Sequence, residues 1–150
     1  MDSSTNNHFT LLLLLFLFIL KRTSSFKNHS SIDEILLFAP KHVTIFNTLA
    51  TRTKLVVHCM NKEKDLGIRE LPIGARFDFR FRVNLRGTTT YNCSFEWPGS
   101  KKKFDIFRAD RDDSETSPYG VCRECIWYIY ERGPCRGKRD GGHSICFSWD

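Results

Sequence analysis

The stretch LVVHCMNKEKDLG, residues 55–67, joins a strand-like half to a charged half. Leu55, Val57 and Cys59 share one side of an alternating run rich in β-branched residues, which predicts a strand. The polar residues that follow predict an exposed loop that closes at Gly67. Cys59 is therefore expected at the end of a buried strand, next to a charged loop.

The cysteines all lie in the second part of the chain: Cys59, Cys93, Cys122, Cys125, Cys135 and Cys146. In a secreted chain of this size, such a set predicts a disulfide framework. The sequence alone does not choose among the possible pairings.

The N-terminus carries an unbroken apolar run, LLLLLFLFIL at residues 11–20, followed by Lys21 and Arg22. A bilayer span needs about 20 apolar residues, so this shorter run predicts a secretory signal peptide over residues 1–25. Because the positive charges follow the apolar run instead of preceding it, a short uncleaved anchor is the alternative. From the predicted signal peptide, we expect an extracellular location.

Residues 26–40 have no clear period and predict an N-terminal extension ahead of a domain over residues 41–150. The extension contains the sequon Asn28-His29-Ser30, a candidate for N-glycosylation. The whole chain has a net charge of +6 at pH 7. This modest excess indicates a solubilising surface rather than a nucleic-acid site, although acidic polymers or anionic membranes would attract it.

From residue 43 onward, apolar residues recur at every second position. The clearest strand covers residues 76–83, where three phenylalanines and a valine alternate with charged residues. In residues 89–97, the same pattern directs Cys93 to the core and Asn92, in the sequon Asn92-Cys93-Ser94, to solvent. Further strands are expected at residues 43–49, 55–59, 104–106, 125–130 and 144–149. The prediction is an all-β fold: a small, disulfide-stapled antiparallel β-sandwich of about seven strands.

Several ordered pieces of the sequence carry a family resemblance, although no single piece is specific. They are Val43-Thr44-Ile45-Phe46-Asn47-Thr48-Leu49, Leu55-Val56-Val57-His58-Cys59, Asp65-Leu66-Gly67, Phe77-Asp78-Phe79-Arg80-Phe81, Thr90-Tyr91-Asn92-Cys93-Ser94-Phe95-Glu96-Trp97, Cys125-Ile126-Trp127 and Gly133-Pro134-Cys135. In this order, the chain resembles the plant self-incompatibility protein S1 family, also called the S-protein homologues.

The resemblance implies a small secreted β-sandwich without catalytic activity, whose founding members are stigma ligands of a pollen membrane receptor. It also implies that the four cysteines of the family pattern correspond to Cys59, Cys93, Cys125 and Cys135. The remaining two, Cys122 and Cys146, would then be extra cysteines that form a third bridge.

Catalytic and metal-binding interpretations of the cysteine, histidine and acidic residues have less support in the sequence. The C-x-x-C of Cys122 and Cys125 enters an apolar strand, not a helix N-terminus, so we interpret it as structural instead of redox-active. A four-thiolate zinc site is improbable in a secreted chain. His58 should face away from Cys59, which argues against a Cys-His nucleophile. The acidic residues of the polar loop at residues 108–120 are interpreted as a solvated turn, not a calcium site.

The leading hypothesis is a secreted recognition or signalling ligand, and the alternative is a cationic defence protein that acts on membranes or wall polymers. The expected partner is a plant cell-surface membrane protein, with no nucleic acid, small-molecule substrate, metal or cofactor, and the chain is expected to be a monomer. Contacts should come from loops on the rigid sandwich. The partner-binding candidates are Lys62, Glu63, Lys64 and Asp65.

Overall fold

The structure is a computed structural model that describes residues 12, 14, 16, 39–137 and 142–149. Apart from positions 12, 14 and 16, the predicted signal peptide lies outside the described residues, as does the sequon at Asn28. Among the described residues, no helix has the length and apolar content that a bilayer span requires.

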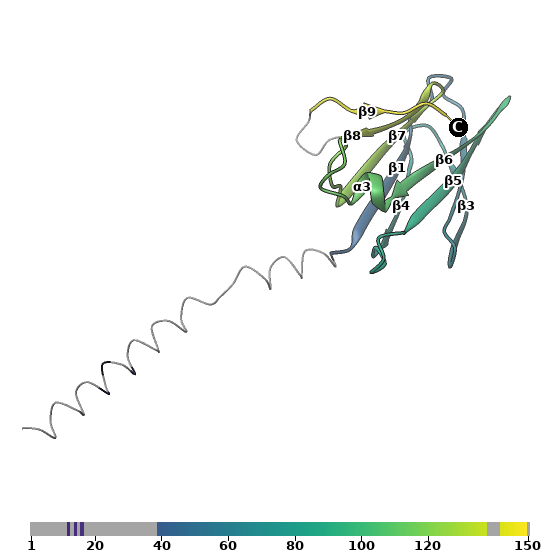
Figure 1. The fold of residues 1–150 in the computed structure, drawn as a ribbon. Helices are drawn as coiled ribbons and strands as arrows, with labels where there is room; N and C mark the ends of the chain where they lie inside the picture. Colours follow the sequence, from purple (N-terminus) through teal and green to yellow (C-terminus); the bar gives the residue numbers. More distant parts are fainter. Residues whose placement is uncertain (1–11, 13, 15, 17–38, 138–141, 150) are drawn as a thin grey trace, which may run out of the picture. The chain divides into compact units, whose positions relative to one another are not determined.

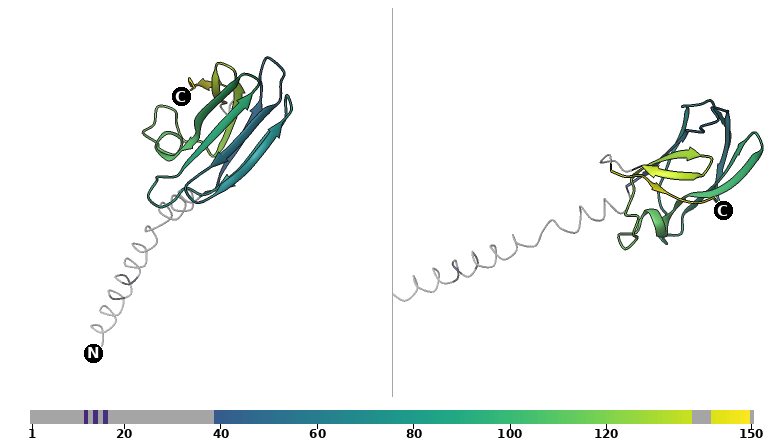
Figure 2. Two further views of the ribbon diagram at one scale, coloured as in Figure 1. Left: turned by 90° about the vertical axis from the view of Figure 1, so that its right-hand side faces the viewer. Right: turned by 90° about the horizontal axis from the view of Figure 1, so that it is seen from above.

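Two sheets pack face to face as the two layers of a sandwich (Figures 1 and 2). The first sheet has the strand order β4-β1-β7-β8-β9, and the second has the order β3-β2-β5-β6. The elements are β1 (Lys41–Asn47), β2 (Leu55–Met60), β3 (Asp65–Leu71), β4 (Arg76–Phe81), β5 (Thr90–Trp97), β6 (Ser100–Arg108), the short helix α3 (Ala109–Asp112), β7 (Glu124–Tyr130), β8 (Gly133–Gly137) and β9 (Ile145–Cys146).

The core lies between the inner faces of the two sheets. Alternate residues of β1, β2, β5 and β7 are buried, as expected for strands with one face on the core. Aromatic rings connect the layers: Phe81 of β4 lies 4.5 Å from Tyr91 of β5, and Phe104 of β6 lies 5.4 Å from Trp127 of β7, between ring centroids. The predicted all-β sandwich is confirmed.

The structure differs from the predicted sandwich in two details. Its described residues form nine strands instead of about seven, and one pair is parallel instead of antiparallel. The parallel pair is β1 and β7, which lie side by side in the centre of the first sheet (Figure 1). Parallel neighbours need a long connection. Here, the connection from β1 to β7 contains all four strands of the second sheet as well as β4.

Strands β3 and β8 escaped the sequence analysis because neither shows a clean alternation. β3 is an edge strand that begins inside the stretch interpreted as loop. β8 contains Gly133 and Pro134, which are unusual in strands. A Cβ on Gly133 would lie 1.9 Å from the carbonyl oxygen of Phe147, so the close approach of the C-terminal segment requires glycine there.

Two predicted boundaries also change. The strand predicted at residues 104–106 is longer, because β6 begins at Ser100, directly after the turn formed by Pro98 and Gly99. The last strand is shorter than predicted, because β9 contains only Ile145 and Cys146. Phe147 and Trp149 continue beyond it and pack against the core.

Candidate recognition surface

The loop between β2 and β3 carries the predicted partner-binding residues on its surface. Lys62, Glu63 and Lys64 are exposed. The side-chain oxygen of Asn61 accepts hydrogen bonds from the backbone N–H groups of Glu63 and Lys64, at 2.9 and 2.6 Å. The backbone N–H of Asn61 donates to the carbonyl of Lys64 at 2.9 Å. The loop is thus a tight Asx-type turn that presents three charged side chains.

Asp65 belongs to the same predicted set but serves partly as an anchor for the loop. Its carboxylate lies 2.7 Å from Nε2 of His58 and accepts the backbone N–H of Gly67 at 2.8 Å. The bond from Gly67 and the contact with His58 hold the pKa of Asp65 below its usual range. His58 points away from the buried Cys59, as the strand alternation predicts.

Three disulfides join all six cysteines: Cys59–Cys93, Cys122–Cys125 and Cys135–Cys146. The first lies in the core, between directly opposed residues of β2 and β5. The expected third bridge between Cys122 and Cys146 is wrong, because each of these cysteines pairs with one that the family pattern already contains.

The observed pairing follows from the faces of two neighbouring strands. Cys125 is buried on the core face of β7, two positions before Trp127. Cys135 is paired across the β7–β8 ladder with Tyr128, which lies on the opposite face. Cys125 and Cys135 therefore lie on different sides of one sheet and bond to Cys122 and Cys146 instead.

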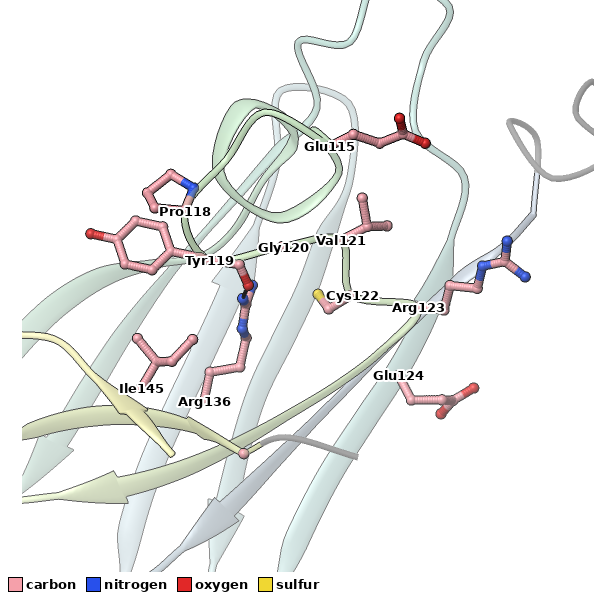
Figure 3. Close-up of a pocket in the computed structure, with 11 residues that line it drawn as sticks. Glu115, Pro118, Tyr119, Gly120, Val121, Cys122, Arg123, Glu124, Arg136 and Ile145 are labelled. Atoms are coloured by element: carbon pink, nitrogen blue, oxygen red, sulfur yellow. Dashed lines mark hydrogen bonds between the residues drawn. The ribbon is translucent and has the colours of Figure 1, made fainter. Parts of the chain in front are cut away.

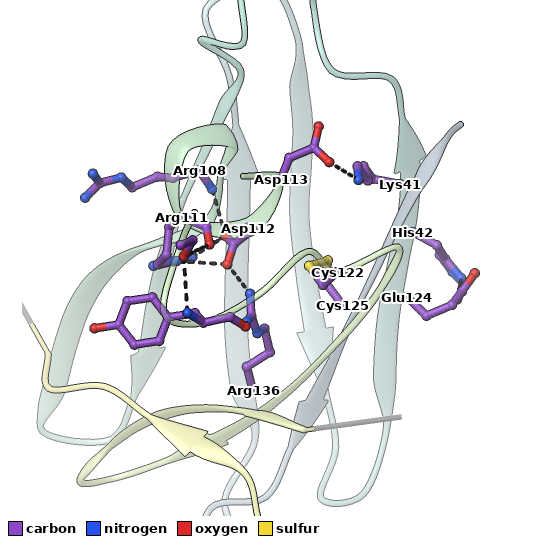
Figure 4. The surroundings of a disulfide bond; sticks show 12 residues. Lys41, His42, Arg108, Arg111, Asp112, Asp113, Cys122, Glu124, Cys125 and Arg136 are labelled. Atoms are coloured by element: carbon purple, nitrogen blue, oxygen red, sulfur yellow. Dashed lines mark hydrogen bonds and ion pairs between the residues drawn. A yellow bond between two sulfur atoms is a disulfide. The ribbon is translucent and has the colours of Figure 1, made fainter. Parts of the chain in front are cut away.

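The loop that follows β6 contains a buried ionic network rather than the predicted solvated turn (Figure 4). Asp112, at the end of α3, is fully buried. Its carboxylate accepts hydrogen bonds from the guanidinium groups of Arg111 and Arg136 and from the backbone N–H of Arg108. Asp113, next in the chain, pairs with the buried Lys41 of β1. The solvated-turn prediction is wrong for Asp112 and Asp113, because their partners Arg136 and Lys41 come from distant strands, whereas Asp110 is exposed as predicted.

Aromatic side chains enclose the Arg111 end of this network. The guanidinium carbon of Arg111 lies 4.9 Å from the ring centroid of Phe104, 5.2 Å from that of Trp127 and 5.0 Å from that of Phe147. Such contacts stabilise a cation that has lost part of its hydration. Sequence reasoning missed these contacts, since the three rings come from separate strands or segments.

A cavity of about 700 Å³ opens beside the network (Figure 3). Residues 118–123 and Glu115 form one wall, and Arg136, Gly137 and Ile145 form another. Cys122 of the local disulfide also lines the cavity. Sequence reasoning missed this cavity, because β8 had not been recognised as a strand.

The described sequon at Asn92 lies in the middle of β5. Its side chain is exposed on the outer face of the second sheet, and its Nδ2 donates to a carboxylate oxygen of Asp105 at 2.9 Å. The position is accessible to solvent, whereas its neighbour Cys93 is fully buried.

The described residues do not form the zinc site or the calcium site considered as alternatives. All six sulfurs are in disulfides and therefore do not supply thiolate ligands. Within the described part of the chain, no group of three or more histidine, cysteine or acidic residues is arranged to hold an ion.

Comparison with known proteins agrees with this fold. The family model described as plant self-incompatibility protein S1 matches residues 42–149. S-protein homolog 3 of Arabidopsis thaliana is 38% identical over 111 residues, which cover 73% of this chain and 73% of that protein. S-protein homolog 5 of the same plant is 38% identical over 109 residues, covering 68% of this chain and 77% of that protein.

A solved structure of SPH (self-incompatibility protein homologue) proteins, described as a widespread family of small, highly stable, secreted proteins from plants, matches with a TM-score of 0.53. The match covers 75% of this chain and 96% of that chain at 18% identity, so it supports the fold alone. The family model and the two Arabidopsis relatives carry the further conclusion: the chain belongs to the plant self-incompatibility protein S1 family.

Proposed function

We propose that this protein is a secreted, non-catalytic ligand that binds a plant cell-surface membrane protein in cell–cell recognition or signalling. Family membership is the observation that carries the proposal. The related SPH proteins are described as secreted, and the N-terminal sequence has the pattern of a signal peptide. A role in pollen–pistil interaction is the form that the family name suggests.

The construction of the domain supports recognition by loops. Its two sheets pack through an aromatic core. One disulfide lies within each sheet, Cys59–Cys93 and Cys135–Cys146, and Cys122–Cys125 closes a local loop before β7. A loop held by a rigid scaffold loses little conformational freedom on binding. The turn at residues 61–64 is already fixed by its own hydrogen bonds, so Lys62, Glu63 and Lys64 would bind without much further ordering.

A binding experiment tests this proposal. Labelled, oxidised protein without residues 1–25 is titrated onto reproductive and vegetative plant cells, at low and physiological salt. Saturable binding that persists at physiological salt and is confined to one cell type is the expected result. Binding that never saturates and disappears with salt would contradict a receptor ligand.

Exchange of the loop tests the assignment of residues within this function. Residues 62–65 are transferred into S-protein homolog 3, and the homologue's loop is placed in this chain. We expect the preference for one cell type to follow the loop. Histidine is placed at the position of the homologue that corresponds to His58, because His58 anchors Asp65 in this chain. An unchanged preference would assign recognition to another surface.

A second candidate is a cationic defence protein, and the arrangement of charge favours it. Two edge strands present exposed basic residues. On β4 these are Arg76 and Arg80, with the exposed Asp78 between them, and on β6 they are Lys101, which pairs with Glu96, and Lys103. Such residues also discourage association between sheet edges. Salt-sensitive, non-saturable adsorption to anionic vesicles or wall polymers would favour this second function.

A further inference from the structure

Strand β6 forms one edge of the second sheet and pairs there with β5 alone. It runs for nine residues, and the turn end of the β5–β6 hairpin projects from the sandwich (Figures 1 and 2). A strand at the edge of a sheet has a second side on which another strand can form hydrogen bonds. The question is which backbone groups β6 presents on that side.

The spacing of Cys59 and Cys93 fixes the direction of these groups. In an antiparallel ladder, opposed residues about 4.5 Å apart between Cα atoms turn their backbone groups away from each other, and bonded pairs are about 5.5 Å apart. The Cα atoms of Cys59 and Cys93 lie 4.1 Å apart across the β2–β5 ladder. The backbone groups of Cys93 therefore point toward β6, where Phe104 is its partner.

The backbones of Lys101, Lys103 and Asp105, which alternate with that of Phe104, consequently face away from β5. An independent contact agrees, because the guanidinium of Arg111 donates to the carbonyl oxygen of Asp105 at 2.7 Å. This bond closes the edge at Asp105. Within the described part of the chain, no other segment bonds to the backbone of Lys101 or Lys103. The open edge thus offers two N–H and two C=O groups.

We propose that an extended, acidic segment of the protein partner adds to this edge as a further antiparallel strand. The inference rests on the proposed function and names the way in which the partner is bound. In strand addition, the main-chain hydrogen bonds provide affinity and the side chains provide selectivity. Residues opposite Lys101 and Lys103 would place their side chains beside these two exposed lysines.

The charge along the open edge favours an acidic strand. Residues 100–104 contain three lysines and no acidic residue. Lys101 pairs with Glu96 of β5 at 2.5 Å, and Asp105, at the closed end, accepts a hydrogen bond from Asn92. Lys103 has no ion pair among the described residues. Three lysines against two carboxylates leave a local excess of one positive charge, and the carboxylates lie beside or beyond the open groups.

The same charges argue against a second copy of this chain. Antiparallel pairing of two β6 strands about Lys102 would place Lys101 of one copy opposite Lys103 of the other, and like charges in opposed positions are destabilising. In an acidic strand, the residue opposite Lys102 would lie on the core side, next to a half-buried lysine stem. An apolar residue between two acidic residues therefore suits this edge.

Amide hydrogen exchange of the oxidised protein without residues 1–25, labelled with ¹⁵N, tests whether the edge is open. The amides of Lys101 and Lys103 should exchange at least about tenfold faster than that of Lys102, which faces β5. Equally slow exchange at all three would overturn the inference.

A defined peptide tests the added strand. The probe is N-acetyl-Val-Glu-Val-Glu-Val amide, which should cause saturable shifts and slower exchange at the amides of Lys101 and Lys103. The peptide with glutamine for both glutamates should bind about fivefold more weakly, as expected for exposed charges. Methylation of both glutamate nitrogens should weaken binding about tenfold, because these nitrogens would bond to β6. Methylation of the central valine nitrogen, which would face away, is the matched control and should have little effect.

Protein variants separate the edge from its charge. Lys103→Pro removes an N–H that takes no part in the β5–β6 ladder, so the variant should fold and bind the peptide about tenfold more weakly. Lys103→Gln keeps the N–H and should weaken binding about threefold. Arg80→Gln, on the edge of the other sheet, is the control and should bind the peptide as the unaltered protein does.

Three results would overturn the inference. The first is the absence of saturable shifts, and the second is equal binding of the glutamate and glutamine peptides. The third is binding that is insensitive to methylation of the glutamate nitrogens, which would indicate adsorption of an anion to the lysines. Shifts of the same amides on raising the protein concentration without peptide would also overturn it, in favour of a second copy.

Failure of this inference differs from failure of the proposed function. If Lys103→Pro binds cells as the unaltered protein does and the peptide causes no shift, β6 is not the contact site, but the ligand function stands. If the unaltered protein shows no saturable binding to any plant cell, the proposed function fails even where the peptide pairs with β6.

Discussion

Asp112 and Arg136 form an ion pair although 24 residues separate them in the chain. The exposed fractions of their side chains are 0% and 5%. The pair joins the end of α3 to β8, and so attaches the loop after β6 to the first sheet (Figure 4). Because an unpaired charge in such a place is costly, the conformation of this loop should depend on Asp112.

Replacement of Asp112 should therefore be among the most destabilising changes on this loop. Asp112→Asn keeps the shape but leaves Arg111 and Arg136 without a counter-charge, and should lower the free energy of unfolding by about 3–5 kcal/mol. Urea denaturation followed by tryptophan fluorescence measures it. Asp110→Asn is the control, because its ion pair with Arg108 is exposed and should contribute at most about 1 kcal/mol. Similar losses in both variants would contradict the assignment.

The buried network shows where sequence reasoning stops. The alternation in residues 76–83 and 89–97 sufficed to predict β4 and β5, because a two-residue period reports directly which side faces the core. No such pattern surrounds Arg136, which lies in a Gly-Pro-Cys-Arg-Gly strand. Because the sequence does not show which face of β8 carries Arg136, it does not identify Arg136 as the partner of Asp112. The acidic residues of the loop therefore resemble an ordinary solvated turn.

Glu131 should make stability depend on pH in the acidic range. Its carboxylate accepts the backbone N–H groups of Ala50 and Thr51 at 3.2 and 3.0 Å, as well as the Thr51 hydroxyl at 3.0 Å. These bonds, that of the Thr51 N–H first, lower the pKa of Glu131 from 4.5 to about 2. A lowered pKa stabilises the fold above pH 4.5, and the contribution is lost as the pH falls toward 2.

The variant Glu131→Gln isolates this effect. Because Glu131 is only partly buried and its hydrogen bonds lie at the surface, we expect a contribution of only about 1 kcal/mol, well below the value that the full pKa shift would give. Free energies of unfolding at pH 6 and pH 2.5 should differ less in the variant than in the unaltered protein. An identical difference in both would contradict the role of Glu131.

The disulfides should contribute unequally to stability. Cys59–Cys93 joins residues separated by 34 positions, whereas Cys122–Cys125 spans only three. In the chain-entropy account, the first contributes about 4 kcal/mol and the second about 2 kcal/mol. Urea denaturation of the two double alanine variants measures the difference. A larger loss from Cys122→Ala/Cys125→Ala would mean that this bridge mainly holds the ionic network in place.

The pairing itself could not have been predicted from the sequence. The ladder places Cys59 opposite Cys93, and both alternations directed these residues to the core. To predict the partner of Cys135, one must know which face of β8 carries it. The glycines and the proline of that strand leave no alternation of polar and apolar residues that would show this. The exposed loop at residues 61–64 was predicted correctly because charge and turn residues mark it locally, whereas the cavity depends on contacts between distant segments.

Asn92 should carry an N-glycan when the chain is produced in a plant secretory pathway. In the folded protein, Asn92 lies in the middle of β5 between two paired strands, so the transferase must reach it before the sheet forms. Formation of Cys59–Cys93 next to it would then close the opportunity. In an Asn28→Gln background, mass spectrometry of the secreted protein should find one glycan, which Asn92→Gln and Ser94→Ala both remove.

Competition between glycosylation and formation of Cys59–Cys93 can be tested with Cys59→Ala. This variant delays closure of the site and should raise the fraction of protein that is glycosylated at Asn92. Equal occupancy with and without Cys59 would contradict this competition, and an unglycosylated secreted protein would contradict modification of Asn92.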